Sequence, residues 1–148
     1  MIEDIKYKRV EGEIPVSFSY TYGLAGEKFF RALYEERFLF ASCSCGEKFI
    51  PPKIYCENCY SAVSDFVEFK GKMFVKSFTI NYRDDKGNIL EEPKIVVLVG
   101  FEGISGGIIS ILKGADKNKV HIGMTVKPIF KEKSKREYSI TDVSFEPA

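Results

Sequence analysis

The chain has 148 residues, of which 45% are hydrophobic and 29% are charged, and its formal net charge at pH 7 is +1. This composition is that of a globular protein with room for one ordinary domain, or for a small metal module beside a compact barrel. No apolar run approaches the roughly 20 residues that cross a bilayer, and the near-neutral charge argues against a dedicated nucleic-acid-binding protein.

The amino-terminal segment, residues 1–41, is predicted to contain an extended arm followed by a helix. Aromatic residues occupy every second position near the end of Val16–Tyr22, an alternation that places three rings on one side of an extended strand. Such an arm packs either on its own domain or on another subunit. From Leu24 to Phe38 the apolar residues recur at spacings of three and four, which predicts an amphipathic helix whose apolar stripe belongs to the core or to an interface.

Residues 42–64 carry the strongest chemical signal of the chain. Its only four cysteines, Cys43, Cys45, Cys56 and Cys59, lie within 17 positions as two close pairs separated by ten residues. Two turns that each supply two thiolates fit one tetrahedral metal ion, so the segment is predicted to be a zinc ribbon, with iron as the alternative metal. A segment this small cannot bury a sufficient core of its own, so its fold is expected to depend on the metal.

Neighbouring residues support the two cysteine turns. Gly46 can adopt the positive φ that turns main-chain N–H groups towards sulfur. Pro51 and Pro52 cannot sit in a central strand, and they favour a turn between the cysteine pairs. A catalytic or redox Cys-x-x-Cys pair is the remaining alternative for these thiols.

The N-terminal sequence bears on the compartment of the protein. It has no apolar secretory segment, which predicts a cytoplasmic protein with reduced cysteines and argues against a disulfide framework. The chain contains 17 lysines, 15 glutamates and no glutamine, a bias in the direction seen in proteins of thermophiles.

Residues 65–148 are predicted to form strands separated by turns. Apolar and β-branched residues dominate six segments, which are 66–69, 73–80, 95–101, 107–112, 125–130 and 138–145. About five strands, with a short irregular or helical insertion at residues 116–120, match a small closed barrel of the oligonucleotide/oligosaccharide-binding type, the OB-fold. The predicted fold class is therefore mainly β with an N-terminal helix, in which a zinc ribbon precedes a five-stranded OB-fold barrel.

Taken together, these motifs resemble the DUF35 family. The resemblance runs from about Leu24 onward and rests on the helical lead-in, the barrel and five short sequences, which are Cys-x-Cys-Gly at 43–46, Pro-Pro at 51–52, Cys-x-x-Cys at 56–59, His121–Val126 and Ser144–Pro147. It implies that the ribbon is rubredoxin-like and is combined with an OB-fold. The first pair departs from the family's usual Cys-x-x-Cys-Gly, because Ser42 stands where the first ligand is expected and Cys43 supplies the thiol one residue later.

The resemblance also implies a role in acyl-CoA metabolism. Proteins of this family are linked to thiolase-like enzymes, hydroxymethylglutaryl-CoA synthase or acyl-CoA hydratases, as scaffolding subunits or as holders of the CoA moiety. We therefore expect an accessory subunit that binds acyl-CoA, a thiolase-like or HMG-CoA-synthase-type enzyme, or both.

The residues themselves offer no catalytic constellation. His121 is the only histidine and stands where a turn is expected. Four thiolates would close the coordination shell of a metal, which leaves no open position for metal-assisted hydrolysis. The acidic pairs at 35–36, 84–85 and 91–92 fall in turns or on solvent faces. We therefore expect a protein that is not an enzyme.

A CoA ligand would need cations for its phosphates, and the loops that OB-folds use for binding supply six of them. They are Arg83 and Lys94 at the first loop, and Lys131, Lys133, Lys135 and Arg136 at the second. Tyr82 and Tyr138 are candidate stacking faces for the adenine. The charged run of the second loop also fits a solvated hairpin tip.

Two other functions would use the same features differently. A single-stranded nucleic-acid-binding OB-fold protein would use the basic loop and the barrel aromatics. A purely structural protein–protein adaptor would bind enzyme subunits through the ribbon, the helix stripe and the aromatic arm, while the barrel stayed empty.

Overall fold

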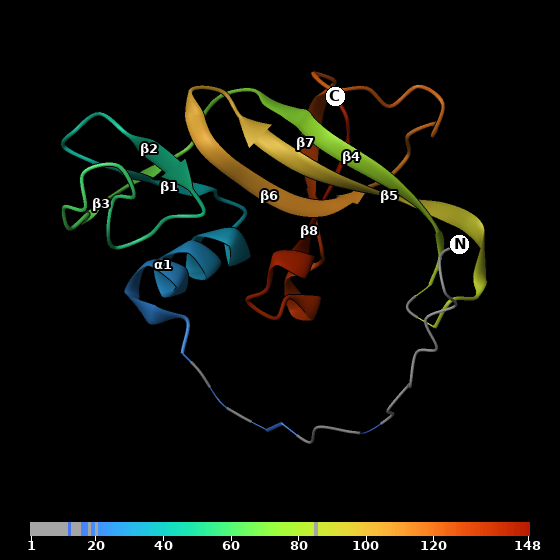
Figure 1. Cartoon of the computed structure of the whole chain (residues 1–148), viewed down its shortest axis with the longest axis horizontal. Coiled ribbons are helices and arrows are strands. Elements are labelled where there is room, and N and C mark those ends of the chain that lie inside the picture. The colour runs from blue at the N-terminus through green and yellow to red at the C-terminus, as the bar shows by residue number, and fades with distance from the viewer. Residues whose placement is uncertain (1–11, 13–15, 18, 20, 85) are drawn as a thin grey trace, which may run out of the picture.

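The computed structural model describes residues 12, 16–17, 19, 21–84 and 86–148. Its elements in chain order are α1 (Gly23–Tyr34), β1 (Leu39–Ser42), β2 (Lys48–Ile50), β3 (Asp65–Glu68), β4 (Met73–Arg83), β5 (Ile89–Phe101), β6 (Ile104–Leu112), β7 (Thr125–Phe130), the 3-10 helices η1 (Lys133–Lys135) and η2 (Ile140–Asp142), and β8 (Val143–Pro147). The protein is therefore mainly β with an N-terminal helix, as predicted (Figure 1). None of the helices in the described part of the chain combines the length and apolar character needed to span a membrane.

Strands β4 to β8 form a five-stranded ring. β4 pairs with β5 and β7, β5 pairs with β6, and β7 pairs with β8, all antiparallel. A parallel bridge between Leu112 of β6 and Phe145 of β8 closes the ring. This is the partly open barrel of an OB-fold, and its core includes the fully buried residues Val97, Val99 and Phe145.

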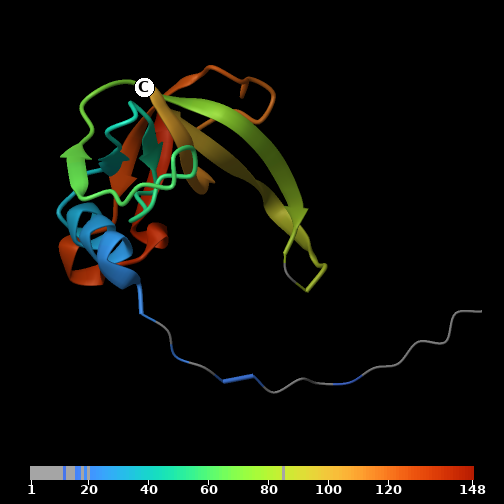
Figure 2. The same ribbon diagram turned by 60° about the vertical axis from the view of Figure 1, so that its left-hand side comes forward.

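The hairpin of β4 and β5 is longer than the sequence indicates. The predicted strands at 73–80 and 95–101 continue to Arg83 and begin at Ile89, so the hairpin extends beyond the barrel (Figure 2). Residues 81–83 are all exposed, although successive side chains of a strand point to opposite faces. Both faces of this extension are therefore largely exposed to solvent.

The ribbon consists of β1, β2 and β3, and it joins the barrel edge to edge. β1 pairs with both β2 and β3, and β2 pairs in parallel with β6 through Phe49 with Ser105 and Ile50 with Gly106. The result is one sheet that runs from the ribbon into the barrel. β3 begins at Asp65, the predicted boundary between ribbon and barrel, and pairs within the ribbon sheet. The division of the chain at 1–41, 42–64 and 65–148 remains a prediction.

The helix ends earlier than predicted. α1 stops at Tyr34 rather than Phe38, because Glu36 adopts φ 61° and the N–H of Arg37 bonds back to the carbonyl of Ala32 at 2.8 Å. Phe38 is nevertheless buried, where it packs among the aromatic rings of the barrel core. The aromatic arm predicted before the helix lies mostly outside the described residues.

The last predicted strand, at 138–145, is also corrected. Residues 140–142 form η2 instead, and β8 covers Val143–Pro147. Tyr138 has φ 56°, a left-handed conformation that a residue other than glycine rarely adopts and that interrupts a regular strand. The carboxylate of Asp142 replaces strand pairing here, since it accepts the main-chain N–H groups of Glu137 and Ser139 at 3.0 Å.

We predict that Gly106→Ala weakens the joint between ribbon and barrel. A Cβ at Gly106 would overlap the carbonyl oxygen of Ile50, which must shift and break the parallel pairing of β2 with β6. Gly103→Ala is the matched control, because Gly103 also has a positive φ but no atom lies within 4 Å of its added Cβ. The control should lose about 1–2 kcal/mol from backbone strain. In urea unfolding, Gly106→Ala should lose at least twice as much, and equal losses would contradict the steric argument.

Candidate functional site

The four cysteines meet in one cluster. Their sulfur atoms all lie within 4.8 Å of one another, with 3.5 Å between Cys43 and Cys59 and 3.7 Å between Cys45 and Cys56. A tetrahedral zinc ion with Zn–S bonds of about 2.3 Å would place its sulfur ligands about 3.8 Å apart. The cluster therefore has the donor set and the spacing to hold a metal ion such as zinc, and Cys43 joins it despite its shifted position in the sequence.

Main-chain hydrogen bonds shape both cysteine turns. In the first turn, the N–H of Gly46 donates to the carbonyl of Cys43 at 2.9 Å, and Gly46 has the positive φ that the sequence predicts, at 95°. In the second turn, the N–H of Tyr60 donates to the carbonyl of Cys56 at 2.9 Å, and Tyr60 adopts φ 60° without being glycine. Cys43 and Cys56 are buried and Cys45 and Cys59 are exposed, so the cluster sits at the ribbon surface.

The core beneath the cysteine turns is small. Apart from Cys43 and Cys56, its buried members are Ala41 and Val63, and Phe49 and Phe66 pack against them. Such a cluster buries far less apolar surface than a domain core, so the ribbon needs a further source of stability.

Two of the thiols, those of Cys45 and Cys59, differ widely in pKa in the absence of a metal. Hydrogen bonds from the hydroxyl and the main-chain N–H of Ser61 lower the pKa of Cys59 to about 6. The main-chain hydrogen bond from Glu47 lowers the pKa of Cys45, but hydrogen bonds with the neighbouring thiols, Cys43 foremost, and desolvation outweigh it and raise the pKa to about 12. Ionising all four thiols together therefore requires a compensating cation, which a divalent metal supplies.

The cations predicted for ligand binding come from two parts of the chain, the β4–β5 hairpin and the loop between β7 and β8. Arg83 ends β4 and donates to the carbonyl of Gly87 at 2.7 Å within the hairpin turn, while Lys94 lies exposed on β5. The other four lie in the loop between β7 and β8, where Lys131 is 3.5 Å from Asp142 and Lys135 is 2.8 Å from Glu132. The structure does not bring the six predicted cations into one cluster.

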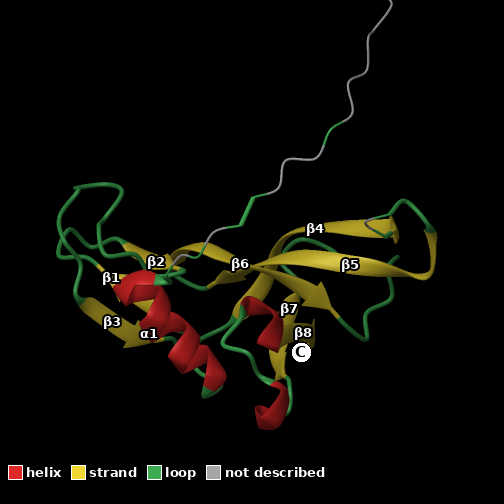
Figure 3. Ribbon diagram, turned by 90° about the horizontal axis from the view of Figure 1, so that it is seen from below, coloured by secondary structure: helices red, strands yellow, loops and turns green. Residues whose placement is uncertain are grey.

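The loop between β7 and β8 instead holds α1 against the barrel (Figure 3). The side chain of Arg136 is 5% exposed; it pairs with Glu36 and donates to the carbonyls of Tyr34 and, at 2.7 Å, Lys131. The rings of Tyr34 and Tyr138 stack 4.3 Å apart with an angle of 7° between their planes. We call this set of interactions the helix–loop contact.

Lys133 strengthens the helix–loop contact. It forms an ion pair with Glu35 at 3.0 Å, and this carboxylate raises the pKa of Lys133. The candidate stacking face of Tyr138 is covered by Tyr34, and Tyr82 lies under the ammonium of Lys117 at 5.4 Å. Both tyrosines therefore already have partners within the protein.

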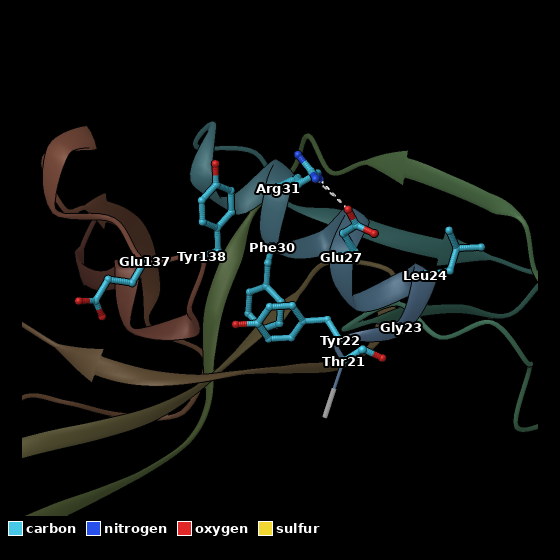
Figure 4. Close-up of a pocket in the computed structure, with 9 residues that line it drawn as sticks. All are labelled: Thr21, Tyr22, Gly23, Leu24, Glu27, Phe30, Arg31, Glu137 and Tyr138. Atoms are coloured by element: carbon cyan, nitrogen blue, oxygen red, sulfur yellow. Dashed lines mark hydrogen bonds and ion pairs between the residues drawn. The ribbon is translucent and has the colours of Figure 1, made fainter. Parts of the chain in front are cut away.

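A pocket of about 920 Å³ lies beside the helix–loop contact, and sequence reasoning did not locate it. Its lining is shown in Figure 4 and consists of Thr21, Tyr22, Gly23, Leu24, Glu27, Phe30, Arg31, Glu137 and Tyr138. The rings of Tyr22 and Phe30 lie 4.7 Å apart, and Glu27 pairs with Arg31 at 2.8 Å. The apolar stripe of the helix indicated one side of this pocket. The other side is formed by Glu137 and Tyr138, which are more than 100 residues away in the sequence, so no local pattern indicated it.

The fold and the sulfur cluster define a class of protein in which a four-cysteine ribbon of the zinc-ribbon type is joined to an OB-fold barrel. The chain is similar to a crystal structure of a DUF35-family protein of unknown function from Sulfolobus solfataricus, with 32% identity and a TM-score of 0.70 over 85% of this chain and 87% of the other. The protein belongs to the DUF35 family.

A second similar structure is described as the Ltp2–ChsH2(DUF35) aldolase. The identity is 25% and the TM-score is 0.63, and the match covers 82% of this chain and 93% of the other. No family model and no curated protein matches the chain.

We predict that Arg136→Met destabilises the protein by about 1–3 kcal/mol, because it removes a nearly buried cation and leaves the carbonyl of Tyr34 unpaired. Lys135→Met is the control, since Lys135 is exposed and pairs only with exposed Glu132 among the described residues, and it should change stability by less than about 0.5 kcal/mol. Thermal unfolding measures both. Equal melting temperatures for the two variants would contradict a stabilising role of the helix–loop contact.

Proposed function

We propose that this protein is a non-catalytic accessory subunit that binds zinc through its four cysteines and works beside a thiolase-like or HMG-CoA-synthase-type enzyme of acyl-CoA metabolism. The observation that carries the proposal is the similarity, over 93% of that chain, to a protein whose description names a DUF35 component of an aldolase. The family membership of this chain supports the comparison.

The metal part of the proposal rests on the donor set and on the small ribbon core. Cys43 and Cys45 would hold the ion from the first turn, and Cys56 and Cys59 from the second. A bound zinc ion would supply a cross-link between the two turns and neutralise the thiolates, and its closed four-sulfur shell would leave no position for a substrate. Iron is the alternative ion for the same four thiolates.

The accessory role agrees with the chemistry of the described residues. His121 is exposed, and its Nδ1 lies 2.9 Å from the carbonyl oxygen of Lys119, where it caps a turn. The one buried carboxylate among them, Asp142, is committed to main-chain N–H groups of its own loop. Neither residue has a partner arranged for proton transfer to a substrate.

The pocket beside α1 is the surface that we assign to the enzyme partner. Leu24 and Tyr22 line it and are 59% and 56% exposed. Aromatic and aliphatic side chains around a cleft are typical of the centre of a protein–protein interface. This surface also continues directly from the helix–loop contact, which holds its two walls together.

Acyl-CoA is the ligand that we propose for the assembled complex. Its phosphate contacts would come from one of the two groups of exposed cations in the predicted set, either Arg83 and Lys94 of the hairpin or Lys131, Lys133 and Lys135 of the loop between β7 and β8. Arg136 is the exception, because its guanidinium is already engaged with the end of α1.

We predict that Cys43→Ser lowers the metal content of the purified protein at least tenfold, because a serine hydroxyl is a far weaker zinc ligand than a thiolate. Ser42→Ala is the control, since Ser42 stands at the usual family position of this ligand but Cys43 is the residue in the sulfur cluster. Elemental analysis of anaerobically purified protein measures zinc and iron. Full metal content in Cys43→Ser would contradict the assignment, and so would loss of metal in Ser42→Ala.

We predict that affinity capture from native cells retains an enzyme of acyl-CoA metabolism, and that Leu24→Glu reduces its yield at least tenfold because a charge would enter an apolar contact. Ile89→Glu is the control, because Ile89 is 76% exposed on the far hairpin. Mass spectrometry identifies the retained proteins and any CoA ester. The accessory role would be wrong if no such enzyme were retained, and the assigned surface would be wrong if both variants behaved alike.

A further inference from the structure

Two short sulfur–sulfur contacts join the two cysteine turns to each other. Cys43 of the first turn lies 3.5 Å from Cys59 of the second, and Cys45 of the first lies 3.7 Å from Cys56 of the second. All four cysteines are free, so neither contact is a covalent bond. The sulfur atoms are nonetheless arranged as two cross-turn pairs.

Each cross-turn pair joins an exposed cysteine to a buried one. Cys59 and Cys45 are exposed, whereas their partners Cys43 and Cys56 are only 6% and 1% exposed. When a thiol is oxidised, the accessible sulfur reacts first with the oxidant, and a second thiol within reach then converts the product into a disulfide. The cluster contains this combination of an accessible thiol and a resolving thiol twice.

A small oxidant can reach both exposed cysteines from solvent. The residues on either side of Cys45 and Cys59 are themselves exposed, and they are Ser44, Gly46, Asn58 and Tyr60. The buried cysteines instead belong to the small ribbon core, together with Ala41 and Val63. An oxidant from solvent therefore meets Cys45 and Cys59 before it meets their buried partners.

The shortened first turn decides which disulfides the four thiols can form together. A single residue separates Cys43 from Cys45, so a disulfide between them would close a small ring that departs from relaxed disulfide geometry. Cys56 and Cys59 have the Cys-x-x-Cys spacing at which disulfides form readily. That disulfide would leave Cys43 and Cys45 with only each other. Complete oxidation therefore favours the two cross-turn pairs.

We propose that the sulfur cluster is an oxidation site at which hydrogen peroxide forms the disulfides Cys43–Cys59 and Cys45–Cys56 and thereby releases the metal ion. In each pair, the exposed thiolate attacks the peroxide, so that the O–O bond breaks, a sulfenic acid forms and the displaced hydroxide takes up a proton. The buried thiolate then attacks the sulfenic sulfur, which forms the S–S bond and expels a second hydroxide as water. Each disulfide thus consumes one peroxide and two protons and yields two water molecules. Disulfide sulfur is not a thiolate ligand, so the metal is no longer held.

The two disulfides replace the cross-link that the metal ion supplies, because they join the same two turns. The first turn lies between β1 and β2, and β2 carries the joint with β6 through Ile50 and Gly106. The oxidised ribbon therefore keeps its fold and its place on the barrel. A chelator has a different effect, since it leaves the two turns with only the small ribbon core. The proposal rests on the metal site of the proposed function for the release of the ion, but not for the pairing of the thiols.

The test is titration of the full-length, zinc-loaded protein with hydrogen peroxide under anaerobic conditions. A zinc-sensitive dye should show one ion released for every two molecules of peroxide consumed, and dithiothreitol with zinc should restore the metal content. Mass spectrometry with electron-transfer fragmentation of unreduced peptides should find Cys43–Cys59 and Cys45–Cys56. The same mapping on reduced, metal-free protein tests the pairing alone, so that failure of the metal site and failure of this proposal give different results.

Two matched double variants separate pairing across the turns from pairing within a turn. Cys45→Ser with Cys56→Ser keeps a cross-turn pair and should form its disulfide with one peroxide. Cys56→Ser with Cys59→Ser keeps the pair of the first turn, and it should instead accumulate a sulfenic acid that dimedone labels at least about tenfold more strongly.

Limited trypsin digestion tests whether the oxidised ribbon stays folded. Cleavage within residues 42–64 should be at least about tenfold slower in oxidised protein than in chelated, reduced protein. The proposal is overturned if peroxide leaves the thiols unchanged, if the parent protein forms Cys56–Cys59 or sulfinic acids instead, or if the two double variants behave alike. Equal cleavage of the oxidised and chelated forms would also overturn it.

Discussion

The parallel pairing of β2 with β6 is the interaction on which the rest of the structure depends. It places the carbonyl oxygen of Ile50 against Gly106, where a residue with a side chain does not fit. Because this pairing continues the sheet from the ribbon into the barrel, the sulfur cluster has a fixed position relative to the barrel. The small core of the ribbon thereby gains the support of the barrel's larger core.

A second connection, the helix–loop contact, fixes α1. Arg136 reaches residues about one hundred positions earlier in the chain and is almost completely buried there. A loop that often binds ligands in OB-folds thus has a structural role in this protein, because its guanidinium and its tyrosine ring both face the helix. A pocket of about 920 Å³ lies beside this contact, and Tyr138 belongs to both.

Three features of the described residues are suited to binding. The sulfur cluster has the donor set of a closed metal site, the pocket beside α1 is apolar and aromatic, and a groove on the barrel, whose lining includes Ile109, Ile111, Lys113 and Lys131, combines isoleucines with lysines. These three features lie on different elements, so the proposed metal ion and the proposed enzyme partner would occupy separate places. This arrangement is the physical basis of the proposed accessory role.

The sequence by itself determined the ribbon and most of the barrel strands, because cysteine spacing, turn residues and β-branched runs are local signals. It placed the end of α1 and the last strand wrongly, since Glu36 and Tyr138 take left-handed conformations that are held by contacts with distant residues. The tertiary structure alone decided that Arg136 is buried, that Tyr138 faces α1, and that Lys113 and Lys131 share a groove. These features depend on contacts between segments that are far apart in the sequence, and local sequence patterns do not predict such contacts.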